Sequence, residues 1–101
     1  MKKTIELSTK RKVAIKDMSI DEVDECQDIL ITEMTNGAVT NVRNMSKART
    51  AWLRRGIAGG DFKKFKKDSN GIAADNVLKE LSEEEKNELV ALIQEYQNMG
   101  E

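Results

Sequence analysis

The chain has 101 residues and a formal net charge of −1; 39% of the residues are hydrophobic, 35% are charged, and Pro and His are absent. This length suits one domain over residues 1–101, and the composition predicts a thin core under a heavily charged surface. The single Cys cannot form an intrachain disulfide or a thiolate metal cluster. His, the commonest general base and metal ligand, is absent. We therefore expect no enzyme activity, no metal and no cofactor.

Residues 1–17 predict a β-hairpin. Ile5 and Leu7 alternate with polar residues, as do Val13 and Ile15, and the stretch STKRK between them supplies a turn. No apolar run here is long enough for a signal peptide or a membrane span. We expect a soluble cytoplasmic protein that does not associate with membranes.

The stretch SIDEVDECQDILITEM predicts a first helix from about Ile20 to Glu33. Ser19 and Glu22 match a capping box, in which the hydroxyl and the carboxylate satisfy orphan amides of the first turn. Cys26 lies among the apolar positions of this helix and has acidic neighbours. It is expected to be a buried structural thiol.

The stretch TNGAVTN interrupts the helical pattern, because Asn-Gly is a strong turn signal. A second helix is expected from about Thr40 to Ile57, ended by the Gly pair of AGGD. A short helix in AADNVLKEL and a long one after Ser82, with Glu85 completing a second capping box, follow. These elements predict a mainly α fold with an N-terminal β-hairpin, a small α+β protein in which about three to five helices of residues 18–101 pack as a compact bundle.

Charge is segregated along the chain. Residues 1–16 carry six bases and one acid, residues 17–42 seven acids, residues 43–67 nine bases and one acid, and residues 75–101 eight acids and two bases. Such alternation predicts that oppositely charged faces meet, either within one chain or between copies in a homo-oligomer. The acidic residues expected to take part in contact between copies are Glu22, Glu25 and Glu84.

The segment RTAWLRRGIAGGDFKKFKK combines the single Trp and both Phe residues with seven of the seventeen bases. It could dock a protein, or it could bind nucleic acid through phosphate contacts and base stacking. The slightly acidic net charge and the place of Trp52 on an apolar helical stripe favour protein docking, although Trp52 could also be core. The expected partner-binding residues are Met45, Arg49, Trp52, Leu53, Arg54, Arg55, Ile57, Phe62 and Phe65.

Three stretches resemble the small tail assembly chaperones of long-tailed bacteriophages: IELSTKRKVAIKDMSIDE, KARTAWLRRGI and LSEEEKNELVALI. The resemblance implies a non-enzymatic, mainly helical protein that multimerises, binds the tape measure protein and keeps that long helical chain soluble during tail assembly. Two other classes stay open. One is a small phage-encoded regulatory protein that binds a host protein or nucleic acid through residues 43–67, and the other is a structural component of the virion tail or head.

Overall fold

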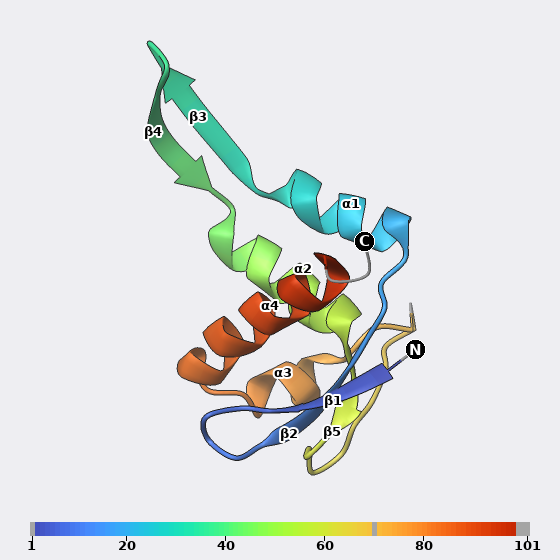
Figure 1. Ribbon diagram of the computed structural model, residues 1–101. Coiled ribbons are helices and arrows are strands. Elements are labelled where there is room, and N and C mark those ends of the chain that lie inside the picture. Colours follow the sequence, from blue (N-terminus) through green and yellow to red (C-terminus); the bar gives the residue numbers. More distant parts are fainter. Residues whose placement is uncertain (1, 70, 99–101) are drawn as a thin grey trace.

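The computed structural model describes residues 2–69 and 71–98, and this part of the chain forms four helices and five strands in two separate sheets (Figure 1). The helices are α1 (Ile20–Ile29), α2 (Met45–Gly56), α3 (Asp75–Lys79) and α4 (Glu83–Asn98), and the strands are β1 (Lys2–Glu6), β2 (Lys12–Lys16), β3 (Ile31–Thr35), β4 (Ala38–Arg43) and β5 (Ile57–Gly60). The predicted mainly α fold with a helix bundle is therefore wrong. The chain is a small α+β protein in which three strands occupy residues that were expected to be helical or to end a helix.

The first sheet has the order β1-β2-β5, and both of its pairings are antiparallel. The pairing of β1 with β2 confirms the expected N-terminal hairpin. Helix α2 ends at Gly56, so the expected helical position of Ile57 is wrong: Ile57 is extended and pairs with Ile15 of β2. The Gly pair does more than stop a helix, because Gly60, at a φ of 129°, lets the chain pass close to the backbone of Lys12.

The second sheet is the β3–β4 hairpin, which occupies residues where one helix was expected to end and another to begin. Asn36 and Gly37 both have positive φ, 53° and 79°, as a two-residue type I′ turn requires. The β-branched residues on both sides of this turn favour strands over helices. The predicted helical positions of Glu33 and Thr40 are therefore wrong, because turn chemistry and β propensity act together here.

Both predicted capping boxes are confirmed. At α1, the Ser19 hydroxyl accepts from the Glu22 amide at 3.1 Å, and the Glu22 carboxylate accepts from the Ser19 amide at 3.0 Å. Ser82 and Glu85 make the same two bonds at the start of α4, at 3.1 and 3.0 Å. These reciprocal bonds fix where each helix begins.

The hydrophobic core lies between the three-stranded sheet and the helices. Val13 and Ile15 of β2, Leu53 of α2, and Leu89 and Ile93 of α4 are all at most 1% exposed. The β3–β4 hairpin gives no residue to this core and projects from the opposite end of the molecule to the first sheet (Figure 1). The hairpin is therefore an arm, and the molecule is elongated, with extents of 48 × 28 × 28 Å.

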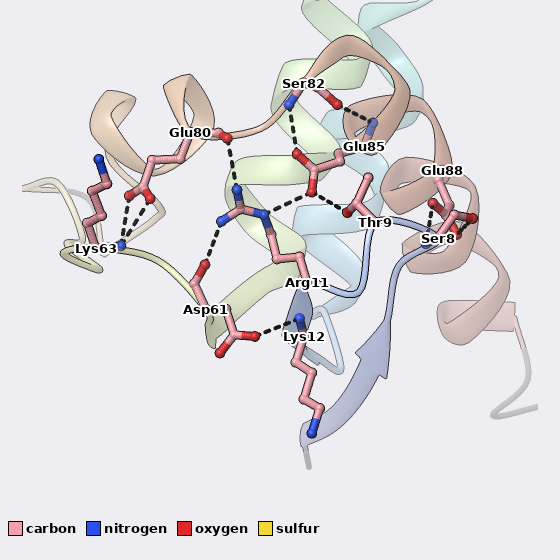
Figure 2. A network of polar contacts seen from close by, with 10 residues as sticks. All are labelled: Ser8, Thr9, Arg11, Lys12, Asp61, Lys63, Glu80, Ser82, Glu85 and Glu88. Atoms are coloured by element: carbon pink, nitrogen blue, oxygen red, sulfur yellow. Dashed lines mark hydrogen bonds and ion pairs between the residues drawn. The ribbon is translucent and has the colours of Figure 1, made fainter.

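A polar network joins the β1–β2 turn to α4 (Figure 2). The Nε atom of Arg11 lies 2.9 Å from Oε2 of Glu85, and the Thr9 hydroxyl donates to the same oxygen at 2.7 Å. Arg11 also donates to the main-chain carbonyls of Asp61 and Glu80, at 2.5 and 3.1 Å. The network therefore connects three segments that are distant in sequence: the β1–β2 turn, Asp61, and residues 80–85.

Candidate docking groove

An open groove of about 600 Å³ lies between α1, α2 and α4. Helix α2 packs against both α1 and α4, and it forms the floor while the other two form the walls. Gln97 connects the walls, because its side chain accepts from the Met18 amide just before α1 at 2.8 Å and donates to the Lys16 carbonyl at 3.0 Å. The lining residues are Val23, Cys26, Gln27, Leu30, Met45, Ser46, Ala48, Arg49, Trp52, Asn87, Val90, Gln94, Gln97 and Asn98.

Helical spacing explains why these side chains share one surface. Ala48 and Arg49 lie three and four residues after Met45, and Trp52 lies four and three residues after them, so the four side chains form one stripe along α2. The same spacing brings the groove-lining residues of α1 and of α4 onto single faces of those helices. Each stripe is only partly used for packing within the chain, which leaves the groove between them.

Exposure rises from the floor of the groove to its mouth. Trp52 on the floor is 7% exposed, whereas Leu30 and Met45 at the mouth are 44% and 65% exposed. Single exposed apolar residues are normal, but a hollow with apolar side chains at both floor and mouth is typical of a binding site. The groove is therefore the best candidate for a docking surface in the described residues.

The β3–β4 hairpin adds an apolar face beside the groove mouth. The pairing register places Thr32 and Met34 opposite Val42 and Val39, so these side chains share one face. Met34 and Val39 are 60% and 59% exposed. Leu30 directly precedes β3, so the apolar face begins next to the groove.

The other face of the hairpin is polar. The Glu33 carboxylate accepts from the side-chain Nδ2 of Asn41 at 3.0 Å and lies 3.0 Å from Nε of Arg43. At the base of the arm, the Asn44 side chain donates to the carbonyl of Ile29 at 3.2 Å. The arm is therefore amphipathic, and its base is hydrogen-bonded to the end of α1.

The structure brings three of the predicted partner-binding residues together in the groove: Met45, Arg49 and Trp52. Leu53 and Ile57 are 1% and 3% exposed, so their side chains belong to the core and offer no surface to a partner. Trp52 belongs to the same core cluster and also lines the groove, so it is both core and groove floor.

The remaining predicted residues lie elsewhere. Arg54 and Arg55 line a shallower hollow of about 400 Å³ on α2 that does not include the groove residues Met45 and Trp52. Phe62 and Phe65 follow β5 in a segment without regular structure, with ring centroids 6.0 Å apart, and both pack against the core. The predicted set is thus divided between the groove, the core and a second surface.

Arginines of the basic segment have acidic partners within the chain. Arg49 pairs with Glu83 at 2.6 Å, Arg55 pairs with Glu25 at 3.1 Å, and Arg54 pairs with Asp75. Hydrogen bonding from Arg54 lowers the pKa of Asp75 below its usual value. Three arginines of this segment are therefore paired within the chain.

The acidic residues predicted for self-association do not form one surface. Glu22 caps α1 and lies 3.3 Å from the Lys16 ammonium, and Glu25 pairs with Arg55. Glu84 is exposed in the first turn of α4. Two of the three carboxylates are thus occupied within the chain.

Cys26 is fully buried, as expected, and touches the groove floor. Burial, followed by the neighbouring Glu25 and Glu22 carboxylates, raises its pKa to about 11, although Arg55 opposes this shift. The thiol is therefore neutral near pH 7. Because the other lining groups are apolar, amide or hydroxyl side chains and the paired Arg49, the groove can bind an apolar surface and hydrogen-bond polar groups at its edge.

Several lining residues escaped prediction, above all Leu30, Val90 and the α4 amides Gln94 and Gln97. For Val90, Gln94 and Gln97 the signal is the helical spacing of apolar and amide residues on α4, which alone does not distinguish a groove wall from a solvated face. The exposed arm residues Met34 and Val39 could have been recognised from the Asn-Gly turn between β-branched runs.

The chain was compared with known proteins, and no family model, curated protein or solved structure matches it significantly. None of the described helices combines the length and the apolar character that a bilayer crossing requires. Likewise, the described residues contain no group of three or more Cys, His, Asp or Glu side chains that could hold a metal ion.

Proposed function

We propose that this chain is a non-enzymatic assembly chaperone that binds an apolar helical client in the groove between α1, α2 and α4. As the resemblance in its sequence implies, the client is the tape measure protein of a long-tailed bacteriophage, and binding takes place in the host cytoplasm. The observation that carries the proposal is the open apolar groove, with Trp52 on its floor and exposed Leu30 and Met45 at its mouth. Covering the client's apolar face would keep it soluble until assembly.

The arrangement of charge favours a protein client over nucleic acid. Arg49, Arg54 and Arg55 are held in ion pairs with carboxylates of the same chain, so each would have to leave its partner to contact a phosphate. The groove itself carries no unpaired base. Binding through the groove would therefore resist salt, whereas binding to phosphates would weaken steeply as salt rises.

Co-expression with the tape measure candidate encoded beside this gene tests the proposal. We expect a soluble complex that survives high salt on an affinity column, and we expect it to be lost in the variant Leu30→Glu/Met45→Glu, which places charge at the groove mouth. The control is Ile72→Glu, at the edge of the shallower hollow. Thr9 also lies away from the groove, but it is bonded to Glu85 and is therefore less well matched. Client solubility that is unchanged by the groove variant would contradict the proposal.

A further inference from the structure

Acidic residues lie beside the groove on both walls, just outside the lining residues, and we call these two acidic borders the shoulders of the groove. Asp24, Glu84 and Glu95 each precede a lining residue by three positions, namely Gln27, Asn87 and Asn98. A three-residue step turns an α-helix by about 300°, so each carboxylate lies about 60° further round its helix than the lining residue. This step leads away from the centre of the groove on α1 and on α4 alike.

These three carboxylates have no cationic partner among the described residues. All three residues are exposed, and the ion pairs of the described chain involve other acids. Arg49, the one base among the described lining residues, pairs with Glu83 at 2.6 Å and donates to the Asn87 side chain at 3.1 Å. The groove therefore combines an apolar floor with uncompensated negative charge on both shoulders.

The walls and floor match the shape of one further helix. Three helices surround the hollow and present apolar side chains at helical spacing, which is the surface that a helix packs against. An extended peptide would need a free strand edge, and the groove walls are helices whose main-chain groups bond within the helix. The amide side chains Gln27, Gln94 and Asn98 are placed to hydrogen-bond polar residues beside an apolar stripe.

We infer that the occupant of the groove is a basic amphipathic helix, with a narrow apolar stripe flanked on both sides by Lys or Arg. This inference rests on the proposed function and specifies the segment of the client that docks. The apolar stripe would contact Trp52 and Met45, and the flanking bases would meet Asp24 on one wall and Glu84 and Glu95 on the other. Opposite charge on both shoulders selects the helix and sets its position in the groove.

Two synthetic helical peptides without Trp test the inference: one carries a Leu stripe flanked by Lys, and the other carries the same stripe flanked by Glu. Trp52 is the single Trp of the chain and lies on the groove floor, so its fluorescence reports occupancy. We expect the Lys-flanked peptide to bind about tenfold more tightly at low salt. This preference should narrow as salt rises, because the carboxylates are exposed and screened.

Charge reversal at the shoulder provides the second readout. Glu95→Lys should reduce the preference for the Lys-flanked peptide, whereas Glu6→Lys, an exposed change of equal charge on β1, should leave it unaltered. Equal binding of the two peptides, or equal effects of the two variants, would overturn the charge selection and leave groove docking intact. Failure of both peptides to change Trp52 fluorescence would overturn the inference, while co-purification of the client would still decide the proposed function.

Discussion

Glu85 caps its own helix and at the same time holds the turn of the first hairpin through Arg11, at 2.9 Å between Nε and Oε2. One carboxylate therefore ties the start of α4 to the β1–β2 turn (Figure 2). Burial alone would raise the pKa of Glu85, but hydrogen bonds from Ser82, Thr9 and Arg11 outweigh it and lower the pKa to about 2. This places a charged group at the junction of sheet and helices.

The Glu85 carboxylate should make stability depend on pH. Its pKa is about 2 in the folded chain and 4.5 as the ordinary value, so its stabilisation is present above pH 4.5 and is lost as the pH falls toward 2. We expect the urea midpoint of the native chain to fall over this interval. Glu85→Gln retains the capping geometry without the charge, so its midpoint should be lower near neutral pH and should fall less on acidification. If the urea midpoint changed with pH in the same way in the native chain and in Glu85→Gln, the Glu85 charge would not be the cause of the pH dependence.

Gly60 is required for the approach of β5 to β2. An added Cβ would lie 2.5 Å from the carbonyl oxygen of Lys12, and the φ of 129° disfavours any other residue. We expect Gly60→Ala to lower the free energy of unfolding by about 2 kcal/mol or more. Gly59→Ala is the control, since its nearest neighbour would be 3.9 Å away, and it should change stability by less than about 0.5 kcal/mol. Urea unfolding followed by Trp52 fluorescence measures the free energy of unfolding of both variants. Similar losses of stability in Gly60→Ala and Gly59→Ala would contradict the requirement for Gly60.

The β3–β4 arm should unfold independently of the core. Gly37 has a φ of 79° in the type I′ turn, so Gly37→Val should disrupt the arm because a β-branched residue is strained there. Since no residue of the arm enters the core, global stability should fall by less than about 1 kcal/mol. Amide hydrogen exchange should become faster in β3 and β4 and stay unchanged in β2. Loss of protection throughout the chain would show that the arm is part of the cooperative unit.

Cys26 should be unreactive in the folded chain. Burial, with the acidic neighbours, raises its pKa to about 11, so the thiolate that attacks disulfide reagents is scarce at about pH 8. We expect a disulfide reagent to modify Cys26 only in concentrated urea, with one thiol released per chain. Fast reaction without urea would show that the groove floor opens to solvent.

The elements predicted correctly are those with strong local signals. Both capping boxes were recognisable because Ser and Glu stand three residues apart before an apolar periodicity, and the first hairpin was recognisable from alternation. The second hairpin was missed because the Asn36–Gly37 turn was interpreted only as a helix break. Strand β5 was missed because a four-residue strand with two Gly carries little pattern of its own and depends on pairing with β2.

The docking site was predictable only in part. Met45, Arg49 and Trp52 share a helical stripe that the sequence shows, and the structure places them in one groove. The walls depend on how α1 and α4 pack on α2, and periodicity along one chain does not determine that relationship. Arg54 and Arg55 were predicted as part of the same surface, but the helical turn carries them to another hollow, where Arg54 pairs with Asp75 and Arg55 with Glu25.

Site-specific photocrosslinking in cells that also express the client tests docking in the groove most directly. A photoreactive amino acid replaces Met45 at the groove mouth in one protein and exposed Lys64, outside the groove, in the other. We expect a crosslink to the client from position 45 and none from position 64, and we expect Leu30→Glu to abolish the crosslink at 45. Crosslinking from position 64 and not from 45 would contradict docking in the groove.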